Sequence, residues 1–313
     1  MGEKTAGEST RLDGPRARRA LMHWYRERGR HDLPWRLTRD PYAVLVSEVM
    51  LQQTQVERVL PYYERWMGRW PTVADLADAP AAEAIREWSG LGYNRRAVNL
   101  QRAAVTVVEH HGGRLPRDTG ALRRLPGVGP YTAAAVVSFA FGKRVALVET
   151  NIARVLARAV AGTASRRGLS ATREAEMAEW FLPSGESRDH NLALMDLGAT
   201  VCTSRSPACE DCPLASQCAW RGAGSPPETG GRGSAATFEE TARFARGRIV
   251  EMLRQEPELS LATIACRLPA IHSQRAGRYL EALERDGLVE HGAGVWRLPG
   301  GSQGRMSIAS PKL

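Results

Sequence analysis

The sequence predicts a mainly α protein with a small α+β domain near its C-terminal end. Residues 16–221 contain successive segments with apolar residues at helical spacing, interrupted by glycine and proline. Residues 238–299 hold three more helical segments, followed by two short apolar runs about a Gly-Ala-Gly turn. Three helices followed by a β-hairpin resemble a winged helix.

Composition suggests the domain boundaries. Residues 1–15 and 300–313 are small, polar and charged, so we expect them to be disordered. Residues 222–237 are rich in glycine, proline and serine and are expected to be a linker between a domain at 16–221 and one at 238–299. In the second domain the expected helices and strands are Thr241–Arg254, Leu261–Leu268, Ser273–Asp286, 288–291 and 295–298.

The charge indicates an anionic partner. The formal net charge is +9 with a pI near 9.7, and only Lys4, Lys143 and Lys312 are lysines, so arginine supplies nearly all of it. The planar arginine fork suits phosphates and base edges. No apolar run reaches membrane-spanning length and the N-terminus lacks an apolar signal region. We therefore expect a soluble cytoplasmic protein.

The stretch at residues 121–151 contains the sequence Leu-Pro-Gly-Val-Gly before an apolar helix, expected at Tyr131–Phe141. Pro126 and two glycines end one helix and allow a tight turn. Pro130 suits the first position of the next helix. Such a hairpin exposes backbone N–H groups beside a positive helix end, which suits a phosphate. An ordinary buried helix pair with a glycine turn is the alternative.

Glu48 lies on an expected helix from about Pro41 to Leu60. Leu45 and Leu51 stand three residues to either side, so Glu48 shares a largely apolar helical face. A carboxyl group in such a place has a raised pKa and can hold a proton near neutrality. An exposed glutamate on an amphipathic helix is the alternative.

A glycine turn at residues 90–96 carries Tyr93, Arg95 and Arg96. A planar side chain in an exposed turn can replace a lost stacking partner in a duplex. The alternative is an aromatic residue packed within the loop.

Four of the five cysteines fall within seventeen residues, at Cys202, Cys209, Cys212 and Cys218, while Cys266 is expected in the core. Four thiolates can surround tetrahedral zinc or a cubane iron–sulfur cluster. A single C-x2-C pair is fewer than a zinc ribbon usually shows, so the spacing points to metal without deciding which.

Taken together, these motifs resemble the helix-hairpin-helix (HhH-GPD) DNA glycosylases of base excision repair, over residues from about 20 to 221. The string SEVMLQQTQV around Glu48 matches the adenine glycosylase branch almost letter for letter. The resemblance implies a helix-hairpin-helix glycosylase fold with a [4Fe–4S] cluster, structural or redox-sensing, held by the four cysteines. It also implies a set of DNA-contacting residues, with Tyr93 as a wedge in the base stack: Gln52, Gln53, Tyr93, Arg95, Leu125, Gly127, Val128 and Gly129.

For catalysis, the resemblance implies that Glu48 protonates a flipped-out purine and that a second carboxylate, Glu149, stabilises the positive sugar. Asn151 would orient Glu149, and Tyr131 would line the sugar's site. Related enzymes that also cut the strand have a lysine where this chain has Tyr131, so a monofunctional enzyme is expected. The substrate would be adenine opposite 8-oxoguanine or guanine in double-stranded DNA, bound by a nucleoid-associated monomer.

Two departures from the family keep alternatives open. Glu149 stands where the family normally has aspartate, and the usual Nudix-like C-terminal domain is replaced by the winged-helix-like one. A thymine, uracil or other modified-base mismatch glycosylase with a rebuilt pocket is one alternative. The other is a protein that binds lesions without excising a base. In the winged-helix-like domain, Arg275, Arg278 and Arg285 would suit DNA contact or protein docking equally.

Overall fold

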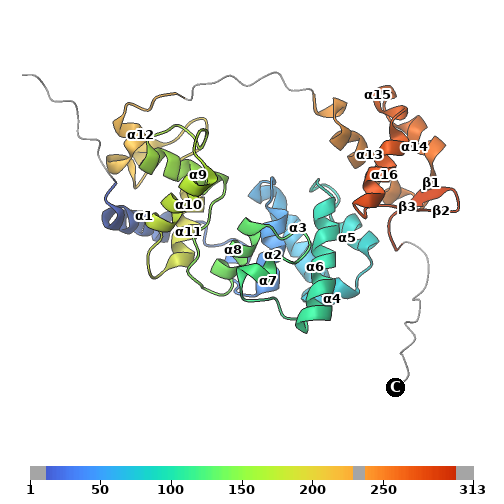
Figure 1. Cartoon of the computed structure of the whole chain (residues 1–313), viewed down its shortest axis with the longest axis horizontal. Coiled ribbons are helices and arrows are strands. Elements are labelled where there is room, and N and C mark those ends of the chain that lie inside the picture. The colour runs from blue at the N-terminus through green and yellow to red at the C-terminus, as the bar shows by residue number, and fades with distance from the viewer. Residues whose placement is uncertain (1–11, 228–236, 301–313) are drawn as a thin grey trace, which may run out of the picture. The chain divides into compact units, whose positions relative to one another are not determined.

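The computed structural model describes residues 12–227 and 237–300 and is mainly helical (Figure 1). Contacts divide the chain into two compact units. The first comprises residues 1–48, 116–124 and 128–232, and the second comprises 49–115, 125–127 and 233–313. This division follows contacts between residues and does not test the domains expected from composition, 16–221 and 238–299, which stay a prediction. None of the helices in the described ranges combines the length and apolarity needed to cross a bilayer.

The first unit contains most of the helices that carry titratable site residues. Its helical elements are α1 (Gly14–Arg28), η1 (Pro34–Arg36), α2 (Pro41–Met50), α7 (Thr119–Leu122), α8 (Pro130–Phe139), α9 (Thr150–Leu156), η2 (Ala157–Ala161), α10 (Ala171–Phe181), α11 (Ser187–Asp196), η3 (Leu197–Val201), η4 (Cys209–Asp211), η5 (Ala215–Gln217) and α12 (Ala219–Gly222). The last two residues of α2 belong to the second unit. Within the first unit, α12 packs against η2, α1 against α11, and α9 against both α10 and α11.

The second unit begins with four helices, which are α3 (Val56–Arg69), α4 (Val73–Asp78), α5 (Ala81–Glu87) and α6 (Arg95–His111). Helix α6 packs against both α4 and α5. A cluster of indole rings lies in the core of this unit, where Trp66 meets Trp70 and Trp88 edge to face, with ring centroids 4.6 and 5.3 Å apart.

The expected single helix from Pro41 to Leu60 is wrong, because α2 stops at Met50 and α3 starts at Val56. The buried Arg96 guanidinium ends α2: it donates to the carbonyl oxygens of Val49 at 2.8 Å and Met50 at 2.9 Å, which a continuing helix would use itself. A side chain from a distant helix therefore supplies the break, which local sequence could not show.

The C-terminal residues form the three expected helices and the hairpin in the expected order, with one additional short helix, Ala270–Ser273, that was not expected. The elements are η6 (Phe238–Glu240), α13 (Ala242–Gln255), β1 (Leu259–Ser260), α14 (Leu261–Arg267), α15 (Ala270–Ser273), α16 (Ala276–Arg285), β2 (Glu290–Gly292) and β3 (Val295–Arg297). The short strand β1 was not expected; it pairs antiparallel with β3, giving the sheet order β1-β3-β2. Cys266 is exposed, so its expected place in the core is wrong.

The expected disordered and linker segments fall largely on residues 1–11, 228–236 and 301–313, which lie outside the described residues. Within the expected N-terminal segment, α1 already begins at Gly14. Asp13 caps that helix by accepting from the Arg16 N–H, and Leu12 is buried.

Candidate active site and cluster loop

Glu48 lies near the end of α2 and is buried, with 5% of its surface exposed. The expected burial on an apolar helical face is therefore confirmed. Burial is the main reason that the pKa of Glu48 rises to about 7, and the charge of Glu149 adds to it. A hydrogen bond from Tyr131 and the charge of Arg36 act in the opposite direction. Glu48 can therefore carry a proton near neutral pH.

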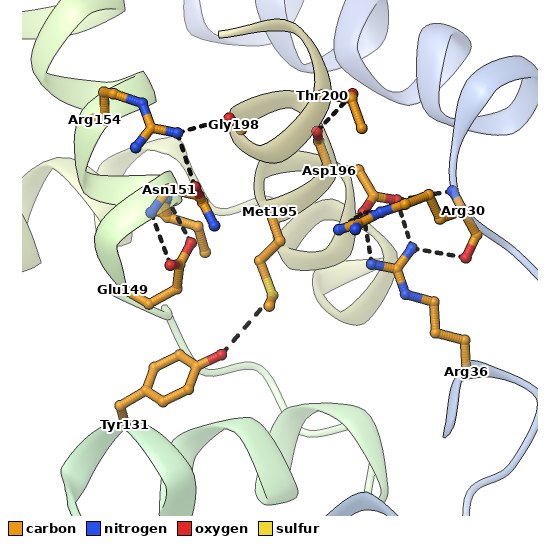
Figure 2. Close-up of polar contacts among 11 residues, drawn as sticks. Arg30, Arg36, Tyr131, Glu149, Asn151, Arg154, Met195, Asp196, Gly198 and Thr200 are labelled. Carbon is orange, nitrogen blue, oxygen red and sulfur yellow. Dashed lines mark hydrogen bonds and ion pairs between the residues drawn. The ribbon is translucent and has the colours of Figure 1, made fainter. Parts of the chain in front are cut away.

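Tyr131 stands in the first turn of α8, immediately after the glycine hairpin. Its hydroxyl donates to the sulfur of Met195 on α11 at 4.0 Å (Figure 2). The same hydroxyl is also a hydrogen-bond partner of Glu48. Burial, together with the two nearby carboxylates, raises the pKa of Tyr131 well above its ordinary value. The phenol therefore stays protonated and acts as a donor to Glu48.

Glu149 is the N-cap of α9, and both of its carboxylate oxygens are used there. They accept the backbone N–H groups of Asn151 at 2.7 Å and Ile152 at 2.8 Å (Figure 2). Burial raises the pKa of Glu149, while these two bonds and the charge of Arg154 oppose the rise. The longer side chain is therefore held in a defined place at a positive helix end.

Asn151 contacts Glu149 through its backbone, and its side chain is engaged elsewhere. The side-chain oxygen accepts from Arg154 at 2.8 Å, and the same guanidinium donates to the carbonyl oxygens of Gly198 at 2.6 Å and Cys202 at 2.8 Å. Gly198 has to be glycine, because an added Cβ would lie 2.6 Å from that of Asn151. Side-chain orientation of Glu149 by Asn151 stays a prediction.

A second buried carboxylate, Asp196 on α11, was not anticipated from the sequence. It is fully buried and binds Arg36 through two bonds of 2.5 and 2.7 Å, with Arg30 at 2.6 Å (Figure 2). Burial alone would raise its pKa, but the hydrogen bonds and charges of Arg36 and Arg30 outweigh burial and lower it. A single aspartate in the apolar run of residues 191–201 was the available signal.

The four cysteines line one hollow of about 290 Å³, counting the space open to solvent, together with Arg158 and Trp220. In the described ranges, no three ligand-type side chains converge closely enough for a single metal ion. Burial raises the pKa of Cys212 to about 12, and Arg158 donates to the sulfur of Cys202 at 3.4 Å. Four half-buried thiols around one hollow fit a multi-iron cluster, whose positive irons would stabilise the thiolates.

The residues expected at DNA are partly exposed. Gly127 and Gly129 are exposed, while Leu125 and Val128 are buried and anchor the hairpin. Gly127 has φ of +75°, and a Cβ there would lie 2.7 Å from that of Asn99, so only glycine fits. Of the remaining expected contacts, Gln53, Tyr93 and Arg95 are exposed and Gln52 is half-buried.

Comparison with known proteins agrees with this geometry. Residues 46–179 match the HhH-GPD superfamily of base excision DNA repair proteins, and residues 202–218 match the iron–sulfur binding domain of endonuclease III. An adenine DNA glycosylase of Mycobacterium tuberculosis is 43% identical over 284 residues, covering 90% of this chain and 92% of the relative.

Two solved structures are also similar. A thermostable thymine-DNA glycosylase has a TM-score of 0.61 and 35% identity, covering 67% of this chain and 98% of its own. A trapped endonuclease III–DNA covalent intermediate has a TM-score of 0.58 and 25% identity, covering 69% and 100%.

The chain therefore belongs to the HhH-GPD superfamily of base excision DNA repair proteins. Within that class it is a DNA N-glycosylase with an iron–sulfur cluster, and residues 202–218, which contain four cysteines, match the iron–sulfur binding domain.

Proposed function

We propose that this glycosylase removes adenine mispaired with 8-oxoguanine or guanine in double-stranded DNA. The observation that carries the proposal is Glu48, a buried carboxyl group whose pKa of about 7 lets it protonate a base at neutral pH. The choice of adenine as the excised base is supported by the 43% identity to an adenine DNA glycosylase. A monomer associated with the nucleoid is part of the proposal.

The proposed reaction uses the two carboxylates in turn. The flipped-out adenine accepts the Glu48 proton on a ring nitrogen, and the bond from the base to the sugar breaks with its electron pair going to the base. The sugar is left with a positive charge, which the Glu149 carboxylate stabilises. Water then adds to the sugar carbon and gives its proton to the Glu48 carboxylate, which restores the starting state.

Tyr131 supports a monofunctional enzyme. Its hydroxyl faces Glu48 where a strand-cutting relative would have a lysine, and Lys143 is exposed beyond the end of α8. Product strands should therefore stay intact until they are heated in alkali. Efficient trapping of a covalent enzyme–DNA adduct with borohydride would contradict this expectation.

Excision of thymine or uracil from mismatches is the second candidate, favoured by Glu149 and by the similar thymine-DNA glycosylase structure. A panel of duplexes carrying adenine, thymine, uracil or hypoxanthine opposite guanine or 8-oxoguanine tests both candidates. Under the proposal, adenine opposite 8-oxoguanine is excised fastest. Faster loss of thymine or uracil would favour the second candidate, and binding of all duplexes without excision would indicate a lesion-binding protein.

A further inference from the structure

Within the second unit, the C-terminal helices pack directly against α5 and α6, which flank the Tyr93 turn. Ala82, Ile85 and Val98 from these helices share one apolar cluster with Ile249 and Leu253 of α13. Backbone contact continues at the far end, where the Ala82 N–H donates to the Pro299 carbonyl at 3.1 Å. The C-terminal domain is therefore fixed beside the expected wedge.

Polar contacts from α13 reach the turn itself. Arg254, whose side chain is only 9% exposed, donates to the Ile85 carbonyl at 2.9 Å and to the Asn94 side chain at 2.8 Å. Arg95 pairs with Asp286 at 3.4 Å. Asn94 and Arg95, the two residues that follow Tyr93, are thus held by contacts with residues of the C-terminal segment 238–299.

Arg243, at the start of α13, contacts the Tyr93 ring directly. Its guanidinium carbon lies 4.8 Å from the ring centroid, and one of its nitrogens donates to the Tyr93 hydroxyl. The same guanidinium lies 4.8 Å from the ring of Phe238, which is 53% exposed. Arg243 therefore covers Tyr93 with both a cation–π contact and a hydrogen bond.

Tyr93 combines an exposed position with a strained backbone. The residue is 40% exposed, and its backbone lies in the left-handed region with φ of +49°, which is unfavourable for a bulky residue. Arg96 supports this backbone by donating to the carbonyl oxygens of Leu91 and Gly92, each at 3.1 Å. Arg96 therefore stabilises the backbone of the turn, while Arg243 contacts the exposed side of the Tyr93 ring.

A ring that enters a base stack must give its faces and its tip to the DNA. In the free protein Arg243 covers one face of the ring and its hydroxyl tip, while the Arg96 guanidinium carbon lies 5.5 Å from the ring centroid. The contacts of Arg243 therefore compete with insertion. We propose that Arg243 is a latch on Tyr93: the C-terminal domain holds the wedge in the free enzyme, and the ring must leave Arg243 before it enters a mismatch. This inference rests on the proposed function and on the role of Tyr93 as a wedge, which the resemblance to the glycosylase family implies.

The latch makes an unusual prediction for the loss of a positive charge. If only a fraction of the free protein has Tyr93 released from Arg243, the apparent affinity for the mismatched duplex is reduced by that fraction. Arg243→Ala should therefore release Tyr93 and strengthen binding to the mismatch. The affinity ratio of mismatched over matched duplex should rise roughly 2-fold to 5-fold, the range expected for one cation–π contact at an exposed site. Fluorescence of 2-aminopurine at the target position should report faster base extrusion.

The controls separate the latch from other roles. In a Tyr93→Ala background, Arg243→Ala should leave the affinity ratio unchanged, and Arg248→Ala, an exposed arginine on the same helix, should leave it unchanged in the wild type. A lower ratio after Arg243→Ala would overturn the latch, as would equal weakening of both duplexes, which is the result expected of a phosphate contact. If Tyr93→Ala itself leaves the ratio unchanged, the assignment of Tyr93 as the wedge fails as well, whereas the proposed excision of adenine is tested separately by the duplex panel.

Discussion

Glu48 and Asp196 are both buried carboxyl groups of the first unit, with 5% and 0% of their surface exposed, yet their pKa values move in opposite directions. Asp196 is bound by two arginines, whose charges outweigh the cost of burial. Glu48 has one phenol as a hydrogen-bond donor and is repelled by Glu149. Burial alone therefore does not decide protonation, because the partners do.

Asp196 and Glu48 also differ in role, since one stabilises the fold and the other is suited to proton transfer. Asp196 is ionised and joins α11 to the segment at Arg30 and Arg36, so it serves the fold. Glu48 is not paired with an arginine in this way, and burial favours its protonated form. Ionising it at alkaline pH therefore lowers the stability of the fold, while its proton near neutral pH is available for the reaction. Arg36 lies between these roles, since its charge acts on both carboxyl groups.

The largest expected effect is on chemistry at Glu48. Glu48→Gln keeps the shape and can still accept the Tyr131 hydrogen bond, but it has no proton to give. Single-turnover excision should fall by about 10²- to 10⁴-fold, the usual contribution of a general acid, while duplex affinity stays nearly unchanged. Excision within a few-fold of the wild type would mean that another group supplies the proton.

Removing the charge of Asp196 should act on stability. Asp196→Asn leaves two guanidinium groups without their carboxylate, and loss of one partner from a buried pair typically costs about 3–5 kcal/mol. Denaturant and thermal midpoints at neutral pH would measure this loss. Glu179→Gln, which breaks an exposed pair with Arg144, is the matched control and should cost less than about 1 kcal/mol. Equal effects of the two changes would remove the distinction between the buried and exposed pairs.

A smaller effect is expected at Glu149. Its two oxygens accept from the N–H groups of Asn151 and Ile152, so the longer side chain is held in one place. Glu149→Asp should move the carboxylate by about one C–C bond and slow excision on the true substrate by up to about a hundredfold. Paired single-turnover rates on each duplex measure it. A faster variant would instead indicate that Glu149 is a drifted form of the family's aspartate.

Local sequence pattern was sufficient to predict some features of the site. Leu45 and Leu51 predicted that Glu48 is buried, and the glycines at 127 and 129 predicted a hairpin before α8, since both signals lie within a few residues of the feature. The break at Met50 and the partners of Asp196 were missed, because Arg96, Arg30 and Arg36 are distant in sequence and meet these groups only in the fold.

The positioning of Glu149 shows the same limit. The sequence placed a carboxylate shortly after α8, but the N-cap of α9 depends on where the helix begins, and helix starts are poorly determined by pattern alone. The latch between Arg243 and Tyr93 joins residues 150 positions apart and has no local signal at all.

The pH dependence of excision tests the central claim most directly. If Glu48 donates the proton with a pKa of about 7, the protonated fraction is nearly complete below that value and falls about tenfold per pH unit above it. Single-turnover excision of adenine opposite 8-oxoguanine should therefore be constant near pH 6 and decline above pH 7 with that slope, and the residual rate of Glu48→Gln should lack the decline. A rate that stays constant or rises between pH 7 and 9 would contradict the assignment of Glu48 as the proton donor.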